Sequence, residues 1–255
     1  MKRAGSIRRL RQIVSLHEKR QGGFGVINGR DLMRLHVDAL FTCDDAGRLV
    51  AVNEPGGAAA PRFFLGQTAD GNAWWFRYDV DETVAKELDA LCESLPTAHQ
   101  AEPFPDTAFL VCLTRDEPVR RIWAGPAFRC PSNLPGHESA VRVTPDNATV
   151  LMPYLDDWCN DVSVGAPMTV VVEDGKAVSV CCSVRITPQA HEAGVETHPD
   201  FRGRGHAVRA VAAWAQAVHE MARIPLYSTS WENEPSRTLA KKLGLMQYGV
   251  DLHIT

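Results

Sequence analysis

The chain has 255 residues, a formal net charge of −4 and a hydrophobic fraction of 45%. This length predicts one or two domains, and the composition excludes a disordered chain, a collagen and a coiled coil as the main architecture. The chain contains no apolar run of about 18 residues, so the sequence predicts no transmembrane helix. The basic N-terminal segment lacks the apolar stretch of a secretory signal, and the mild acidity of the chain does not favour broad nucleic-acid binding. We therefore expect a cytoplasmic protein with no membrane or nucleic-acid partner, and a homodimer stays open.

The first part of the chain, residues 1–125, reads mostly as β-hairpins. Turn sequences such as Asp44–Gly47 between apolar runs are typical of hairpins, and Asp81 can cap a helix whose leucines recur at helical spacing. The predicted elements are a helix over 6–20, strands over 39–43, 48–52, 62–65 and 73–78, a helix over 81–95, and strands over 109–114 and 119–123. We expect a smaller β-rich α+β domain, whose role the sequence does not indicate.

A segment rich in Pro and Gly, residues 125–136, is expected to connect this domain to a second one over residues 126–255. In the second domain strands alternate with helices, which predicts an α/β fold with a mixed sheet. The predicted elements are a strand over 139–143, a helix over 148–158, strands over 168–173, 177–185 and 191–197, a helix over 205–223, a strand over 226–230, a helix over 236–242 and a strand over 248–254.

Seven cysteines are scattered along the chain without a Cys-x-x-Cys spacing. Without a secretory signal, this pattern predicts reduced thiols. The ligand spacing of a structural zinc site is missing, so no metal is expected.

The segment that follows the strand over 191–197 carries the clearest chemistry. Pro199 ends the strand, and two glycines precede a long helix whose apolar residues fall on one face. Amides at a helix N-terminus are unsatisfied, glycine allows a ligand to approach the backbone, and Arg202 and Arg204 add positive charge. This combination predicts a cradle for a pyrophosphate.

Two motifs together resemble the GNAT superfamily of N-acetyltransferases. The first, Arg202-x-x-Gly205-x-Ala207 after a strand and Pro199, is similar to the acetyl-CoA loop of that family. The second, Asn233 with a serine three residues later and a helix ending in Leu-Gly-Leu, is similar to the family's second cofactor motif. The resemblance covers about residues 139–255. Residues 1–125 carry none, and they are either a degenerate copy of the same fold or an unrelated β-rich domain.

The resemblance implies an acetyl-CoA-dependent N-acetyltransferase that needs no metal. The acceptor, an amine of a small molecule or a protein, would attack the thioester directly. Acetyl-CoA would lie in a wedge where the strand ending at Thr197 and the strand over 226–230 splay apart. The residues implied to bind it are Val195 and Thr197 through their backbone, Arg202, Gly203, Arg204, Gly205, His206 and Ala207 at the pyrophosphate, and Asn233 and Ser236 at the pantetheine arm or the nucleotide.

The general base has three candidates: His191, Glu196 and Glu192. His191 lies eleven residues before Arg202, where several family members carry the base, and its ordinary pKa suits proton transfer near neutral pH. On a regular strand His191 and the two glutamates face opposite sides, unless a bulge re-aims them. Each of the three can also be a surface or edge side chain without a catalytic role.

The general acid is less defined. Many family members carry a tyrosine directly after the leucine of the second motif, whereas here Ala240 follows Leu239. Tyr248, Tyr227 or Ser236 could substitute, or the thiolate leaves without a dedicated acid. Ala240 also favours an alternative, a non-catalytic acyl-CoA-binding module with the same fold. A third reading is a transferase that uses another acyl donor, or another acceptor such as a hydroxyl.

Overall fold

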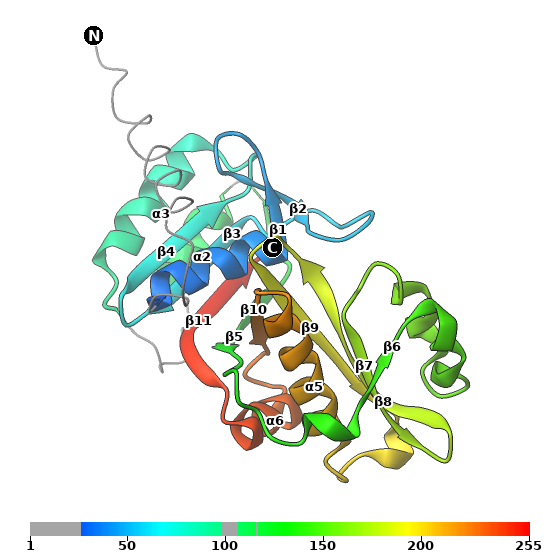
Figure 1. Cartoon of the computed structure of the whole chain (residues 1–255). Helices are drawn as coiled ribbons and strands as arrows, with labels where there is room; N and C mark the ends of the chain where they lie inside the picture. Colours follow the sequence, from blue (N-terminus) through cyan, green and yellow to red (C-terminus); the bar gives the residue numbers. More distant parts are fainter. Residues whose placement is uncertain (1–26, 98–106, 116) are drawn as a thin grey trace.

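The computed structural model describes residues 27–97, 107–115 and 117–255, and the helix predicted over 6–20 lies outside these residues. Among the described elements of the first half, one helix is followed by four strands, then by two helices and a further strand (Figure 1). They are α2 (Gly29–Leu40), β1 (Phe41–Cys43), β2 (Leu49–Val52), β3 (Phe63–Thr68), β4 (Gly71–Phe76), α3 (Glu82–Ser94), α4 (Thr107–Leu113) and β5 (Ile122–Arg129).

The second half begins with 3-10 helices around one short strand and continues as alternating strands and helices. Its elements are η1 (His137–Ser139), β6 (Val141–Val143), η2 (Pro145–Leu151), η3 (Asp156–Asp161), β7 (Met168–Glu173), β8 (Lys176–Ile186), β9 (Ala190–Thr197), η4 (Pro199–Phe201), α5 (His206–Glu220), β10 (Ile224–Ser228), α6 (Glu234–Leu243) and β11 (Met246–Ile254).

Nine of these strands form one mixed sheet in the order β4-β3-β11-β5-β10-β9-β8-β7-β6 (Figure 1). The neighbours pair antiparallel except β9 and β10, which are parallel. β1 and β2 pair separately as a two-stranded ribbon. The mixed α+β architecture predicted from the sequence is therefore confirmed.

The two halves exchange strands at the centre of this sheet. β5, from the first half, lies between β10 and β11, and β11, from the second half, lies between β5 and β3. The domain boundary expected between residues 125 and 126 falls inside β5. The sheet is thus continuous across that boundary, and a division into two independent units stays a prediction.

The two faces of the sheet carry different helices, as the alternation of side chains along β9 shows. Ala190 packs in a cluster with Leu32 and Met33 of α2, whereas Ala193 and Val195 pack against the cluster that contains α5 and α6. At the other end of the sheet, α3 and α4 pack against β3 and β11. The β9–β10 region is therefore covered by α2 on one face and by α5 and α6 on the other.

Three segments differ from the prediction. α2 was not predicted from the sequence, and residues 39–40, which were expected in a strand, form its last turn. The Asn28 side chain caps this helix by accepting a hydrogen bond from the Asp31 amide. The strand predicted over 109–114 is α4, because Phe109, Cys112 and Leu113 are spaced to pack on one side of a helix. The helix predicted over 148–158 is wrong as well, since this stretch falls in the 3-10 helices η2 and η3.

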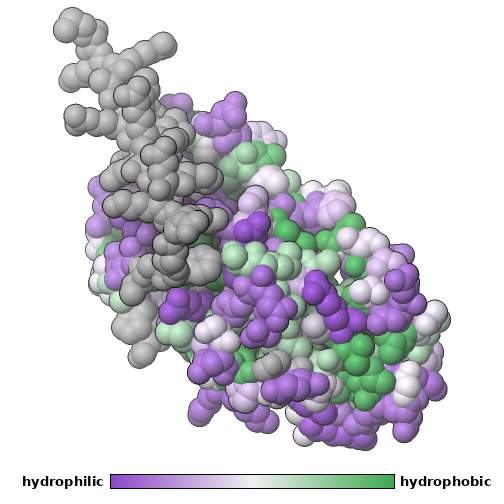
Figure 2. Space-filling model, viewed as in Figure 1, coloured by the Kyte–Doolittle hydropathy of each residue, from purple (hydrophilic) through white to green (hydrophobic). Residues whose placement is uncertain are grey.

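Hydrophilic residues predominate on the face seen in Figure 2, and a hydrophobic area is visible near the β6–β8 end of the sheet. Large apolar side chains from this end are exposed, such as Val141, Met152 and Val164. Among the helices of the described residues, none combines the length and apolar character needed to cross a membrane.

Candidate active site

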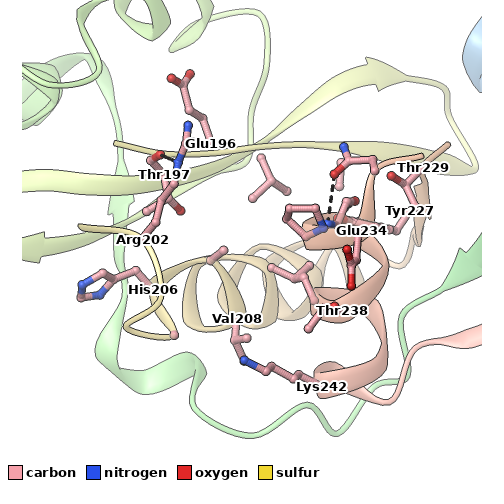
Figure 3. A pocket seen from close by; sticks show the side chains of 18 of the residues that line it. Glu196, Thr197, Arg202, His206, Val208, Tyr227, Thr229, Glu234, Thr238 and Lys242 are labelled. Atoms are coloured by element: carbon pink, nitrogen blue, oxygen red, sulfur yellow. Dashed lines mark hydrogen bonds between the residues drawn. The ribbon is translucent and has the colours of Figure 1, made fainter. Parts of the chain in front are cut away.

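The parallel strands β9 and β10 form a fork. They pair only at Ala190, His191 and Glu192 of β9, opposite Ile224, Pro225 and Leu226 of β10. Beyond these positions the strands run on without a ladder between them, and a cavity of about 900 Å³ opens there (Figure 3). Its described lining comes from the end of β9, the loop into α5, the end of β10 and α6, with Trp123 of β5.

Backbone groups of β9 face the open side of this fork. The Ile224 N–H donates to the Gln189 carbonyl at 2.9 Å, and on the opposite edge of β9 the His198 N–H donates to the Val178 carbonyl at 3.0 Å. Because the hydrogen-bonding direction alternates along a strand, odd-numbered residues of β9 direct their N–H and C=O groups toward β10. The main chains of Val195 and Thr197 therefore line the opening, as the wedge predicted from the sequence requires.

The N-terminus of α5 points into the same cavity. Gly205 precedes the helix with φ of 78°, and Gly203 has φ of 78° as well, a left-handed conformation that favours glycine. No side chain of the described residues caps this helix start. The first amides of α5, which have no partner within the helix, are thus presented to a ligand, and the helix dipole favours an anion there.

The two arginines of the loop differ in their surroundings. Arg202 lines the cavity and its Nε donates to the Thr197 carbonyl at 3.0 Å. Arg204 is bonded to Glu173 at 3.2 Å and to the Asp200 carbonyl at 3.1 Å, and it is not among the described residues of the lining. Of the two arginines, Arg202 therefore provides the positive charge that faces the cavity near the start of α5.

His206 and Lys242 complete the basic groups of the lining. His206 is 2% exposed and its Nε2 lies 3.0 Å from Glu173; burial lowers its pKa, partly offset by that carboxylate. Lys242 is exposed on the last turn of α6 and was missed in the sequence, where it reads as an ordinary surface residue. Figure 3 shows Lys242 on α6, apart from Arg202.

The second motif folds as a capped helix. The Asn233 side chain accepts from the Ser236 amide at 3.1 Å and so caps α6, and the Gly244 amide donates to carbonyls of the last turn. The Ser236 hydroxyl lies 2.5 Å from that of Tyr227, and both residues line the cavity. Burial raises the pKa of Tyr227 to about 12, although the hydrogen bond to Ser236 opposes this shift.

Ala240 lies in the core between α6 and the sheet and is 1% exposed. Of the hydroxyl groups considered as substitutes for a tyrosine at this position, those of Tyr227 and Ser236 face the cavity. Tyr248 is buried on the α2 side instead and is not in the described lining.

The three candidate bases lie in different surroundings. His191 is buried on the α5 side, where its Nδ1 lies 2.9 Å from the Ser183 hydroxyl, and burial lowers its pKa. Glu196 is exposed, lines the cavity and accepts from the Trp158 indole at 2.6 Å. Glu192 is 3% exposed at the base of the fork.

Glu192 reaches the cavity through a serine. Its Oε1 accepts from the Ser228 hydroxyl at 2.7 Å, and Ser228 lines the cavity at the end of β10. The structure therefore brings both carboxylates, Glu192 and Glu196, to the fork and directs His191 to the opposite face. Ser228 was missed in the sequence, where a lone serine at a strand end carries no signal. Among the described residues, no group of three or more His, Cys, Asp or Glu side chains is arranged to hold a metal ion.

Comparison with known families gives one match: residues 167–249 match the model of the GNAT acetyltransferase family. The resemblance of the C-terminal half to this family is thereby confirmed. No curated protein matches the chain.

Solved structures similar to this chain include several acetyltransferases. A GCN5-related N-acetyltransferase-like protein from Streptococcus suis is 15% identical, with 98% of this chain and 100% of that chain covered and a TM-score of 0.48. A GNAT-family acetyltransferase from Novosphingobium aromaticivorans is 18% identical over 53% of this chain and 65% of that one, with a TM-score of 0.44. A tandem GNAT protein from the clavulanic acid biosynthesis pathway is 14% identical over 79% and 81%, with a TM-score of 0.40.

Proposed function

We propose that this chain, whose residues 167–249 match the GNAT acetyltransferases, moves an acetyl group from acetyl-CoA to an amine of a small molecule or a protein. The fork between β9 and β10 carries the proposal, because it opens beside an uncapped helix N-terminus and an arginine that lines the cavity. A thioester-bearing chain with a pyrophosphate at its far end fits this arrangement. When bound, acetyl-CoA supplies the activated acetyl group.

The residues at the α5 end of the cavity would hold the pyrophosphate. The first amides of α5 would donate to phosphate oxygens, and Arg202 would add a charge-assisted hydrogen bond. Gly203 and Gly205 allow this approach because they have no side chain between the backbone and the ligand. Their left-handed backbone conformation would be strained by any other residue. Lys242 would neutralise negative charge on the α6 side of the cavity.

The open backbone edge of β9 would orient the pantetheine arm. The N–H and C=O groups of Val195 and the N–H of Thr197 face the fork, so they would extend the sheet by pairing with the amides of the arm, whereas the Thr197 carbonyl accepts from Arg202. An N–H directed at the thioester oxygen would also stabilise the negative charge that develops on it.

Ser228 and Glu192 would remove the proton from the incoming ammonium. The Ser228 hydroxyl already donates to Glu192, so its oxygen lone pairs are free to accept an N–H of the ammonium. As the ammonium proton passes to Ser228, the serine proton passes to the Glu192 carboxylate. The neutral amine then attacks the acetyl carbon, and the proton on Glu192 later returns to solvent.

Tyr227 would protonate the thiolate that leaves when the carbon–sulfur bond breaks. Its hydroxyl lines the cavity beside Ser236, and a pKa of about 12 keeps it protonated across the physiological range. The second proton on the new amide nitrogen would replace the one that Tyr227 gives up. The net products are an acetylated amine, a free thiol and one proton.

The alternative, a non-catalytic acyl-CoA-binding module, is favoured by Ala240, which offers no acid at the position where many GNAT enzymes carry a tyrosine. Calorimetry with acetyl-CoA and thiol release with a panel of amines separate the two readings. We expect micromolar binding and amine-dependent thiol release above the hydrolysis seen without amine. Binding of acetyl-CoA without thiol release for any amine would favour the non-catalytic module. Thiol release only with a different acyl-CoA would mean that the acyl donor is not acetyl-CoA. The absence of binding at high micromolar acetyl-CoA would reject the proposed acetyltransferase function.

A further inference from the structure

A buried chain of polar groups continues from Glu192 into the first half of the molecule. His36 of α2, which is 0% exposed, lies between two carboxylates: its Nδ1 is 3.3 Å from Glu192 Oε2 and its Nε2 is 2.8 Å from Asp251 Oδ2. Asp251 of β11 is also 0% exposed and lies 3.3 Å from His253 Nε2. The path from the cavity therefore runs through Ser228, Glu192, His36 and Asp251.

The two contacts of His36 differ in kind. The contact with Asp251 is an aligned hydrogen bond, whereas neither His36 Nδ1 nor Glu192 Oε2 has a hydrogen-bond partner among the described residues. Glu192 is thus paired with the charge of His36 while one of its oxygens keeps its capacity to accept.

The surroundings require a cation at His36. A buried carboxylate without a nearby positive charge is strongly disfavoured, and here two carboxylates flank one imidazole. Burial opposes the charged form of His36, but Glu192 and Asp251 outweigh it and raise its pKa to about 10. Burial would raise the pKa of Asp251, but hydrogen bonds from His253 and His36 lower it.

We propose that His36 is a positioning residue for the acetyl transfer: it supplies the positive charge beside the Glu192 carboxylate and directs that carboxylate at Ser228, so that α2 of the first half completes the site. This inference rests on the proposed function. His36 keeps its own proton throughout, because Asp251 holds it from the other side. The first half would then have a catalytic role that the motifs of the second half do not reveal.

Several other titratable groups face this cluster and enter its pH dependence. From β11 these are Tyr248, whose pKa burial raises well above its ordinary value, and His253 beyond Asp251. Tyr227 of β10 and Cys130 after β5 feel the Glu192 charge, and burial raises their pKa values. The two tyrosines and Cys130 are neutral near pH 7, so His36 is the cation that lies beside Glu192 within the described cluster.

The test compares His36→Gln with a matched control, His219→Gln. The first substitution removes the positive charge that lies 3.3 Å from Glu192, whereas His219 is a half-buried histidine on α5 bonded to the backbone carbonyl of Cys130 and not to Glu192 or Asp251. We expect the acid limb of the kcat profile to move up by about one pH unit in His36→Gln, because the ionised carboxylate loses its partner. On the acid limb kcat then falls about tenfold, while KM for acetyl-CoA and the profile of His219→Gln stay unchanged.

A loss of activity that is equal at all pH values, with an unmoved acid limb, would overturn the proposal and leave His36 a structural residue. If His36→Gln does not fold, nitrogen NMR of the imidazoles in the unaltered chain decides the same point. We expect one histidine to remain doubly protonated at about pH 8, assigned as His36 by its absence in any soluble variant or by its contacts to Phe64 and Tyr248 protons. A neutral His36 at this pH would overturn the proposal, whereas an unaltered chain without acetyl-CoA turnover would instead overturn the proposed function.

Discussion

Two strand pairs in the same sheet are built in opposite ways. β5 and β11 pair at eight positions, from Arg129 opposite Met246 to Ile122 opposite Ile254, and their apolar residues enter the core. β9 and β10 pair at three positions and then separate around the cavity. The long antiparallel pairing of β5 with β11 thus contributes to a continuous core. The short parallel pairing of β9 with β10 leaves room for the candidate active site.

The two pairs depend on each other through β10. Its other edge pairs antiparallel with β5, at Leu226–Arg129, Tyr227–Phe128 and Ser228–Ala127. The end of β10 that carries Tyr227 and Ser228 is therefore held in place by residues 127–129 of β5, although β9 no longer pairs with β10 there. The end of β10 beside the fork thus keeps its pairing on the edge that faces β5.

The largest expected effect comes from removing the first half of the chain. A fragment of residues 126–255 begins inside β5 and lacks β3 and α2, so Leu252 and Ile254 of β11 lose their neighbours. Exposure of each such side chain costs about 1.5–3 kcal/mol. We expect the fragment to lose cooperative thermal unfolding and acetyl-CoA binding, measured by circular dichroism and calorimetry beside the full chain.

A soluble fragment that unfolds cooperatively and binds acetyl-CoA as the full chain does would contradict this expectation. It would establish residues 126–255 as an independent domain, as the sequence alone suggests. Co-expression with residues 1–125 is the matched control, since the pairing of β11 with β3 can then form between the two fragments.

A smaller effect is expected from Tyr227→Phe, which removes a single hydroxyl at the end of β10. If Tyr227 protonates the leaving thiolate, kcat falls about a hundredfold while the Kd for acetyl-CoA changes little. Tyr78→Phe, at a residue 59% exposed on the opposite part of the sheet, is the control. An unchanged kcat would mean that the thiolate leaves without this acid.

The smallest effect is expected at the loop itself. Arg202→Gln should raise the Kd for acetyl-CoA about tenfold, because one charge-assisted hydrogen bond to phosphate is lost. Arg204→Gln should raise it less, since Arg204 is bonded to Glu173 outside the described lining. Equal effects, measured by calorimetry on both variants, would show that Arg204 turns to the phosphate when the cofactor binds.

Local motifs in the sequence indicate the proposed cofactor-binding residues more readily than the residues around Glu192. Gly205 and Asn233 are readable because each performs a local task, a left-handed turn or a helix cap, that leaves a motif. His36 leaves none, because its partner Asp251 lies 215 positions away along the chain. Only the folded sheet, with β11 inserted beside α2, brings these two side chains together.

The fold was predicted where local patterns agree with the final packing and missed where they do not. The strands and helices from Met168 to Ile254 follow their apolar periodicity closely. α4 contains β-prone residues such as Phe109 and Val111, so tertiary packing against α3 decided its conformation over local preference. α2 was hidden because its apolar end runs directly into β1 at Phe41.

The exchange of β5 and β11 also fixes an order of events during synthesis. When the ribosome has made β3 and β5, the strand that belongs between them has not yet been translated. Both strands then present unpaired edges, which are the sites where nascent chains associate wrongly. The edges of β3 and β5 that flank β11 therefore lack their final partner until β11 emerges.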